Sequence, residues 1–388
     1  MDLNYENLCI YTLNRIFGYE PSIAHCLIEN LGSASALFDM DGRELIGVLG
    51  VNSRYRSQIT PSELEKSSRE LRWLEDRGYR FLPCTDADYP ALLKDCPDSP
   101  VGLYLSSSSS PRDIFSRRSI AVVGTRDISP YGREWCRRIV MALATTKDKP
   151  TIVSGLAMGT DIIAHLTALE CGLPTIGVMA TGIETIYPVR HRQYAKAIRE
   201  SACSALASDY PPGTAPVAFN FLRRNRIIAG LSEATVLIES KIKGGGLITA
   251  NLAFSYDRDV YALPGRIDDP CSEGCNYLIH RKIAEPITSP DSFLESLGLG
   301  TFSRRKMADL ETELAERFGR ELSPGELSQL TRIALLVKSE RGITPDGICT
   351  RLSYPYSLTL RLIGLMVTEG FMHMDMAQRC SIEARKTF

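Results

Sequence analysis

The sequence predicts an α/β fold in which a parallel sheet is covered by helices on both faces and flanked by helical segments. Two observations support this fold class. Short runs rich in Val, Ile, Ala and Leu recur through the middle of the chain, and helical patterns lie between most of them. Strands that are apolar along their whole length are buried on both faces, which is typical of parallel sheets.

The first 78 residues are predicted to form a helical module. Glycines at positions 18, 32, 42 and 50 divide residues 3–58 into short helices. A longer helix is expected to start at Thr60, because Thr60-Pro61-Ser62-Glu63 forms a capping box with proline at the first helical position, and Gly78 ends it. Short helices joined by glycine turns resemble modules of the SAM or helix-hairpin-helix type.

The central domain, predicted over 79–299, alternates strands with helices. A helix is expected to begin at Ser129-Pro130, where a capping residue precedes proline. Further helices are predicted at 160–171, 190–201, 221–231 and 247–256. The strands are predicted at 101–105, 119–123, 151–153, 175–179, 205–208, 235–239 and 259–262.

The C-terminal part is predicted to contain a linker and a small domain. Residues 300–322 are rich in charges of both signs and are expected to form a linker or a solvated helix. Three helices should follow, the first opened by the capping box Ser323-Pro324-Gly325-Glu326, and residues 371–376 alternate like a strand. This pattern predicts a winged-helix domain over 323–388. Its third helix carries a single basic residue, Arg361, so we expect a protein-contact or regulatory role.

The composition limits the classes of function. A chain of 388 residues is expected to hold two or three domains. The formal net charge is −1, so binding to nucleic acid would need a local basic patch. No apolar run is long enough to span a membrane, and the first residues lack a signal-peptide pattern. We therefore expect a cytoplasmic protein.

Neither a metal nor a cofactor is predicted. The eleven cysteines are scattered, and the pair Cys271 and Cys275 lacks the second pair of ligands that a closed zinc site needs. We expect reduced thiols instead. Asp161 and His165 lie one helical turn apart, and we favour a buried hydrogen-bonded pair over a catalytic or metal site. Alternatively, Asp161 accepts hydrogen bonds from the amides of the 154–160 loop.

Four predicted strands are followed by loops that combine glycine with serine or threonine, at 124–126, 154–161, 180–183 and 241–249. Such loops allow backbone amides to approach an anion at the carboxyl edge of a sheet. Arg126, Lys241 and Lys243 stand beside them, so we favour a bound polyanion over simple tight turns. The spacings GxGxxG and GxxxxGK[ST] are absent, which argues against a dinucleotide site and a P-loop ATPase.

The segment FNFLRRNRIIAG (219–230) adds an arginine cluster. A helix starting near Phe221 would place Arg223 and Arg226 on one face near its first turn. Cations there oppose the helix dipole by about 0.3–1 kcal/mol each, which favours a polyanion lying across that end. Phe219 and Phe221 either stack on bases or pack in the core, and Arg224 either joins the site or forms a structural ion pair.

Together these motifs resemble the DprA family (DNA-processing protein A, also called Smf). The matching segments are VVGTR (122–126), SGLAMGTDIIAH (154–165), YPPGT (210–214), NFLRRNRIIAGLS (220–232) and GGLITA (245–250). Further similarity at 89–93 and 262–265 extends the resemblance over about 79–285. It implies an extended Rossmann-like core.

The resemblance implies a non-catalytic protein that binds single-stranded DNA. Such proteins act as dimers and load the RecA recombinase on incoming strands in natural transformation, and the helix around 276–280 is a candidate dimer contact. In many relatives a basic residue precedes the motif where Val217-Ala218 stand here, which implies weaker binding. The phosphate contacts would be Thr125, Arg126, Gly155, Leu156, Ala157, Gly159, Thr181, Gly182, Lys243, Gly244, Gly245 and Gly246, with Phe221 facing a base and Arg223, Arg224 and Arg226 forming a positive pocket.

Two other classes of function remain open from the sequence. A nucleotide-processing enzyme similar to the phosphoribohydrolases would carry the motif PGGxGTxxE, in which the glutamate does the chemistry. The nearest segment, 244–251, lacks both the proline and that glutamate. A purely structural scaffold that uses the winged helix would leave the arginine cluster unexplained.

Overall fold

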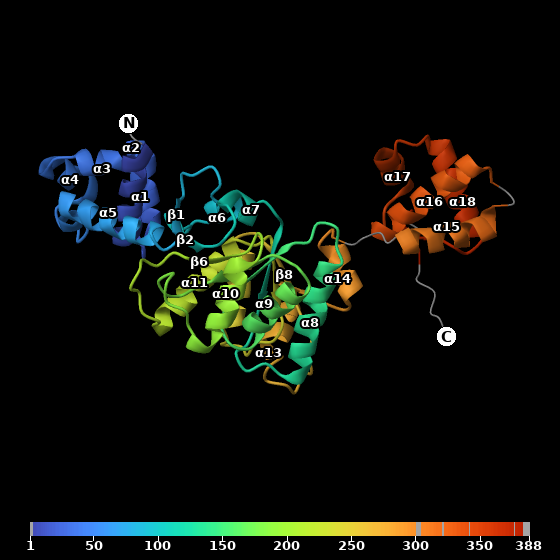
Figure 1. Cartoon of the computed structure of the whole chain (residues 1–388). Helices are drawn as coiled ribbons and strands as arrows, with labels where there is room; N and C mark the ends of the chain where they lie inside the picture. The colour runs from blue at the N-terminus through green and yellow to red at the C-terminus, as the bar shows by residue number, and fades with distance from the viewer. Residues whose placement is uncertain (1–2, 300–303, 320–321, 341, 376, 383–388) are drawn as a thin grey trace. The chain divides into compact units, whose positions relative to one another are not determined.

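The computed structural model describes residues 3–299, 304–319, 322–340, 342–375 and 377–382. The chain divides into two compact units, at 1–300 and 301–388. Each unit is described by itself (Figure 1).

The larger unit is built on one sheet. Within the described residues its nine strands lie in the order β1-β2-β6-β5-β4-β3-β7-β8-β9. The strands from β6 to β9 in this order pair in parallel, which confirms the predicted α/β class. The bounds are β1(Tyr79–Pro83), β2(Gly102–Ser106), β3(Ser119–Val123), β4(Thr151–Ser154), β5(Thr175–Val178), β6(Ala205–Ser208), β7(Ala234–Leu237), β8(Asp259–Ala262) and β9(Glu285–Pro286).

One edge of the sheet is antiparallel, a detail that the predicted parallel core did not include. Strand β1 pairs antiparallel with β2, and β2 pairs antiparallel with β6. Strand β1 was not predicted from the sequence. Burial increases along this strand, from the exposed Arg80 through the half-buried Phe81 to the buried Leu82. The segment therefore shows neither the continuous apolar run nor the strict alternation by which a strand is predicted.

Helices cover both faces of the sheet (Figure 1). In β3, Ile120 and Val122 join the core beneath α8(Pro130–Ala144), α9(Thr160–Glu170) and α14(Pro290–Ser296). Ala121 and Val123 alternate with them and join the opposite core, with α11(Ala218–Gly230), α12(Gly245–Ser255) and α13(Glu273–His280). The period of two along a strand therefore fixes which helices each strand residue meets. Helix α10(Arg192–Glu200) packs on β6 through Ile198.

The N-terminal helices extend the same core instead of forming a separate compact unit. Phe17 belongs to the cluster that contains Leu82 of β1 and Leu93 of α6(Ala91–Lys94). The ring of Tyr11 meets the rings of Phe81 and Tyr104 edge-on, with centroids 4.8 and 5.7 Å apart. The helices are α1(Leu3–Phe17), α2(Pro21–Leu31), α3(Ser35–Asp39), α4(Gly42–Leu49) and α5(Pro61–Glu75). The apolar face of α1 thus covers the antiparallel edge of the sheet.

The smaller unit begins earlier than predicted. Within 300–322, α15(Arg304–Phe318) buries Leu310, Leu314 and Phe318 in the C-terminal core, so it is neither linker nor solvated helix. Residues 300–303 and 320–321 lie outside the described residues. The unit continues with α16(Pro324–Ser339), α17(Pro345–Leu352), α18(Tyr356–Thr368) and an antiparallel pair, β10(His373–Met374) and β11(Cys380–Ser381). Its assignment to the winged-helix class stays a prediction.

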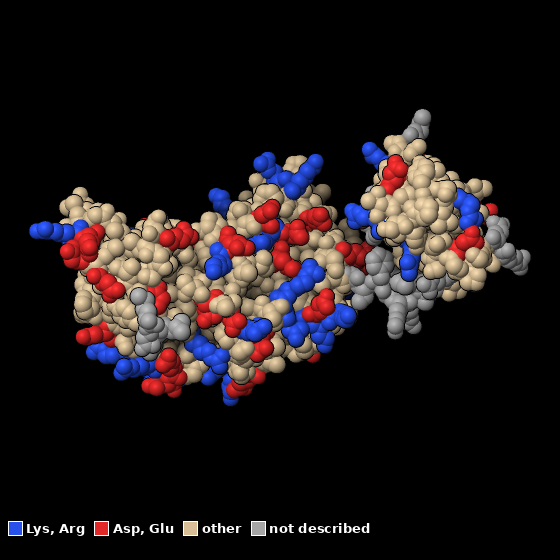
Figure 2. Space-filling model, turned by 90° about the horizontal axis from the view of Figure 1, so that it is seen from above, with Lys and Arg blue, Asp and Glu red and all other residues tan. Residues whose placement is uncertain are grey.

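Charge is mixed over the surface. On the face shown in Figure 2, basic and acidic side chains lie intermixed, in keeping with the formal net charge of −1. In the part of the chain that the structure describes, no helix combines the length and the apolar character that crossing a bilayer requires.

Candidate nucleic-acid interface

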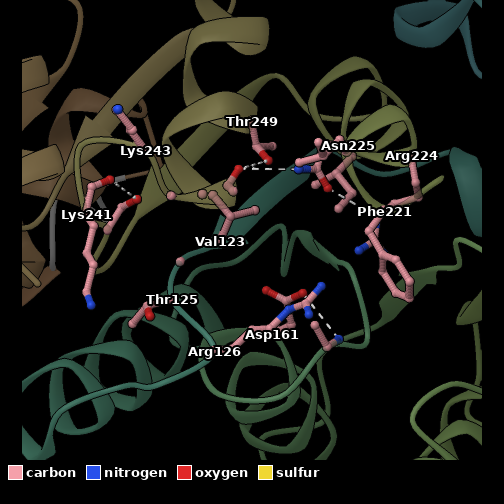
Figure 3. Close-up of a pocket in the computed structure, with 18 residues that line it drawn as sticks. Val123, Thr125, Arg126, Asp161, Phe221, Arg224, Asn225, Lys241, Lys243 and Thr249 are labelled. Carbon is pink, nitrogen blue, oxygen red and sulfur yellow. Dashed lines mark hydrogen bonds between the residues drawn. The ribbon is translucent and has the colours of Figure 1, made fainter. Parts of the chain in front are cut away.

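An open pocket lies at the carboxyl ends of β3 and β7, and its volume is about 420 Å³ (Figure 3). These two strands are neighbours, although β4 follows β3 along the chain on the other side. The direction of chain order therefore reverses between them, and open α/β sheets bind ligands at such a reversal. The lining residues are Val123, Gly124, Thr125, Arg126, Ala157, Asp161, Phe221, Leu222, Arg224, Asn225, Ile228, Ser240, Lys241, Lys243, Gly244, Gly245, Gly246 and Thr249.

Close backbone contacts at two glycines hold together the loops around the pocket. A Cβ atom on Gly246 would lie 2.9 Å from the Cα of Gly124. One on Gly159, whose φ is +76°, would lie 2.4 Å from the carbonyl oxygen of Thr125. Glycine is thus needed where α12 and the loop before α9 meet the end of β3. These glycines bring three loops together around one opening.

The N-terminus of α12 faces the pocket. Gly244 precedes this helix and has no side chain to cap its first amides, so the positive end of the helix dipole is available to an anion. Asn225 Nδ2 and Thr249 Oγ1 both donate to the carbonyl oxygen of Gly245, at 3.3 and 3.1 Å. They hold the start of the helix in place. The exposed Lys243 belongs to the loop that leads into it.

Arg126 and Phe221 form one side of the pocket, and Tyr187 packs next to Phe221 without lining the pocket itself. The exposed Arg126 places its Cζ atom 5.2 Å from the ring centroid of Phe221, and Tyr187 lies 5.3 Å from the same ring. A guanidinium over a ring gains cation–π attraction, which keeps both groups at the pocket rim. Tyr187 was not predicted from the sequence. The feature that could have indicated it is the presence of an aromatic residue in the loop after the predicted strand 175–179.

Beneath the loop after β4, Arg224 and Asp161 are buried together. Arg224 donates to the carbonyl oxygen of Gly155 at 2.5 Å and also to that of Val178. Burial raises the pKa of the Asp161 carboxyl, and the charge of Arg224 opposes that rise. Burial likewise lowers the pKa of Arg224 to about 10. Arg224 therefore supports the loop from below and also reaches the pocket.

Asp161 orients the loop, which was the second of the two alternatives. It accepts a hydrogen bond from the amide of Ala157 at 3.3 Å. His165 instead places its Nδ1 atom 2.7 Å from the hydroxyl of Thr175, so the favoured Asp161–His165 pair was wrong. A Cβ atom on Gly155 would lie 2.5 Å from Arg224 Nη2, so only glycine lets the backbone pass there.

Arg223 and Arg226 do not line the pocket, contrary to the predicted cluster. They bind Asp209 at 2.8 and 2.6 Å, and their side chains are only 10% and 6% exposed. Arg223 also donates to the carbonyl oxygen of Gly18, and Arg226 to that of Asp98. Helix α11 begins at Ala218, so both residues lie beyond its first turn, where the dipole argument no longer applies.

The turn after β5 is also occupied internally. Thr181 is buried and its hydroxyl donates to the carbonyl oxygen of Thr185 at 2.6 Å. A Cβ atom on Gly182 would lie 2.7 Å from the carboxylate of Glu184. Leu156 packs in the core with a φ of +57°.

The predicted residues divide into two sets. Thr125, Arg126, Ala157, Phe221, Arg224, Lys243, Gly244, Gly245 and Gly246 line the pocket, whereas Gly155, Leu156, Gly159, Thr181, Gly182, Arg223 and Arg226 do not. The structure adds Leu222, Asn225 and Thr249 to the lining, which also includes Lys241, the cation expected beside these loops. Among the described residues, no group of three or more His, Cys, Asp or Glu side chains is arranged to hold a metal.

Comparison with known proteins identifies the family. The family model for DNA recombination-mediator protein A matches residues 80–298. Protein Smf of Escherichia coli (strain K12) is 39% identical over 251 residues, which span 65% of this chain and 65% of that protein, just under two thirds of its length. The X-ray structure of DNA processing protein A from Streptococcus pneumoniae is similar with a TM-score of 0.59 and 28% identity, over 75% of this chain and 94% of that chain.

A second solved structure, of DNA processing protein A from Helicobacter pylori, is described as having a unique single-stranded DNA binding mode. It is similar with a TM-score of 0.50 and 28% identity, over 56% of this chain and 95% of that chain. These matches confirm the resemblance that the motifs indicated. Because the family model matches more than half of its length, this chain belongs to the DNA recombination-mediator protein A family.

Proposed function

We propose that this protein binds single-stranded DNA without catalysing a reaction, and that the pocket between β3 and β7 holds the sugar–phosphate backbone. The observation that carries the proposal is the group of exposed cations at this pocket. Arg126, Lys241 and Lys243 are all exposed, and no ion pair among the described residues engages them. Unpaired cations beside a helix N-terminus suit successive phosphates.

The aromatic rings at the rim suit bases. Phe221 and Tyr187 lie together beside Arg126, and stacking on aromatic rings tolerates any base sequence. Binding of single-stranded DNA by the Helicobacter pylori protein supports the same role here.

Catalysis finds no support in this pocket. Among the lining residues, the carboxylate belongs to Asp161. This carboxylate accepts a hydrogen bond from the amide of Ala157 and lies beside the buried Arg224. A general acid or base must reach the atom whose proton it moves. The enzyme alternative therefore lacks a suitably placed group, as it lacks the motif glutamate in sequence.

We further propose that the protein acts in the cytoplasm as a homodimer that helps load RecA recombinase on incoming strands in natural transformation. Family membership supports these roles. Helix α13 is the proposed dimer contact, since its Tyr277 is exposed. Sedimentation at high protein concentration tests the dimer, and a strand-exchange assay with RecA and a coating protein tests loading.

Fluorescence anisotropy with labelled oligothymidine tests DNA binding. We expect a preference for single over double strands and a fall in log affinity with log salt of roughly 0.7 for each phosphate contacted. Arg126→Ala should weaken binding by about 5- to 10-fold, as expected for one charge-assisted contact. The exposed Arg112→Ala on α7(Pro111–Phe115) is the matched control. Equal affinity of the two variants, or release of free base from nucleoside monophosphates, would contradict the proposal.

A further inference from the structure

Two exposed aromatic side chains next to the pocket have no part in the site described above. Phe219, in the first turn of α11, is 63% exposed, and Tyr19, between α1 and α2, is 57% exposed. Their ring centroids are 6.2 Å apart and the ring planes are inclined by 33°. Exposed apolar surface shared by two segments far apart in the sequence marks an interaction site more often than an isolated exposed ring does.

Tyr19 is held in a fixed position by α11. Its hydroxyl donates to Asn220 Oδ1 at 3.3 Å, and the Cζ atom of Arg223 lies 5.0 Å from its ring centroid. Arg223 is itself fixed by Asp209 and by the carbonyl oxygen of Gly18, the residue before Tyr19. A ring that is already immobilised loses little further freedom when a ligand stacks on it.

These rings continue from the wall of the pocket. Leu222 lines the pocket and is 49% exposed. Phe219 lies three residues earlier in α11, so the two side chains share one face of the helix. The ring of Tyr19 lies next to that of Phe219. We call the surface formed by Leu222, Phe219 and Tyr19 the apolar strip.

The charges around the apolar strip suit bases better than phosphates. Arg223 is committed to Asp209, and Glu20, adjacent to Tyr19, pairs with Arg54 at 2.5 Å. Arg126 and Lys243 are cations at the pocket that a phosphate could approach. The basic residues near Tyr19, in contrast, are already paired with carboxylates. Bases present an apolar face that aromatic rings bind without regard to sequence.

We propose that the apolar strip stacks the bases adjoining those held at the pocket, so that the N-terminal helices supply a second subsite for single-stranded DNA. The inference rests on the proposed function, because the strip continues from the pocket that would hold the backbone. The strand would leave the pocket past Leu222 and run over Phe219 to Tyr19. The two subsites differ in kind, since the pocket binds charge and the strip binds base faces.

The test uses Phe219→Ala and Tyr19→Ala in the full chain, with oligothymidines of increasing length. The shortest strands, which fill only the pocket, should bind as they do to the unmodified protein. Longer strands should bind on the order of 10-fold more weakly to each variant. The salt dependence should not change, because no phosphate contact is lost. Tyr19→Phe keeps the ring and should restore most of the affinity.

Phe254→Ala is the matched control, because Phe254 is 53% exposed and lies near the end of α12 opposite the pocket. Because Phe219 is mostly exposed, its replacement leaves the fold intact, and a thermal unfolding curve checks this. Unchanged affinity at every strand length overturns the subsite and leaves the proposed function standing. This is the result expected if the apolar strip binds a protein partner instead of DNA. A reduced salt dependence in these variants also overturns base stacking. Failure of the unmodified protein to bind any single strand overturns both.

Discussion

Two groups of basic side chains lie near the start of α11, and they differ in their partners. Arg223 and Arg226 are buried against one carboxylate, Asp209, at the end of β6. Arg126 and Lys243 are exposed at the pocket, and no ion pair among the described residues engages them. Closeness in sequence favoured the first group as the anion site. The position of a single buried acid shows that this group is structural and that the second group is free to bind.

The largest effect is expected on removing that acid. Asp209→Ala leaves two arginines buried without their counter-charge, and breaking a buried pair costs about 3–5 kcal/mol. We expect the free energy of unfolding of the larger unit to fall by this amount in urea denaturation. Asp268→Ala is the control, because Asp268 pairs with Arg266 on the surface, where solvent screens the interaction and little stability depends on it. Similar stabilities for the two variants would show that the arginines are not held as described.

The second largest effect is expected on the pH dependence of stability, through His165, which lies near the buried Arg224. Burial, with the nearby charge of Arg224 acting in the same direction, lowers the pKa of His165 to about 3. In the unfolded chain a histidine titrates near pH 6.5, so below this pH the unfolded state binds a proton that the folded state refuses. Stability should therefore be lost as the pH falls from 6.5 towards about 3, by about 1.4 kcal/mol for each pH unit.

His165→Asn removes the titrating group, so its stability should change less with pH than that of the unmodified protein. The difference between the two proteins should reach about 2 kcal/mol between pH 6.5 and pH 5, because other titrating groups cancel. Urea denaturation at a series of pH values measures it. Parallel pH profiles would mean that His165 titrates in the folded state as it does in the unfolded chain.

The pocket itself can be broken through its glycines. Gly246→Ala would place a Cβ atom 2.9 Å from the backbone of Gly124, whereas Gly245→Ala meets no atom within 4 Å. Overpacking costs about 1–3 kcal/mol, so we expect Gly246→Ala to lose stability and DNA affinity together. Gly245→Ala should keep its stability. Thermal unfolding and anisotropy measure both, and equal stability of the two variants would exclude the close contact between α12 and the end of β3.

Patterns with a strict period could be predicted from the sequence. The strands 119–123, 205–208 and 259–262 agree with β3, β6 and β8, because apolar runs between helices specify a buried parallel sheet. The loops on either side of the β3–β7 junction were likewise predicted as anion sites, and they line the pocket.

Pairings between distant segments could not be predicted. Asp209 lies 14 residues before Arg223, and nothing in the local pattern of 219–230 shows that they meet. The start of α11 was placed three residues late, at Phe221 instead of Ala218, so the dipole argument was applied to the wrong turn. Tyr187 packs beside Phe221 from a loop that has no periodic pattern, so this contact could not be predicted.

The smallest effect on stability is expected from the free cations of the pocket. Lys241→Ala and Lys243→Ala remove exposed charges, and such changes usually alter stability by less than about 0.5 kcal/mol. Each should nevertheless reduce the salt dependence of single-strand binding by about 0.7 if that lysine contacts one phosphate. For Asp209→Ala, by contrast, we expect a large change in stability. Anisotropy over a range of salt concentrations, with unfolding curves for the same variants, measures both quantities. If a lysine variant loses stability but keeps the salt dependence of single-strand binding, that lysine is structural, like Arg223 and Arg226. It would then have to be removed from the group of cations proposed to bind DNA.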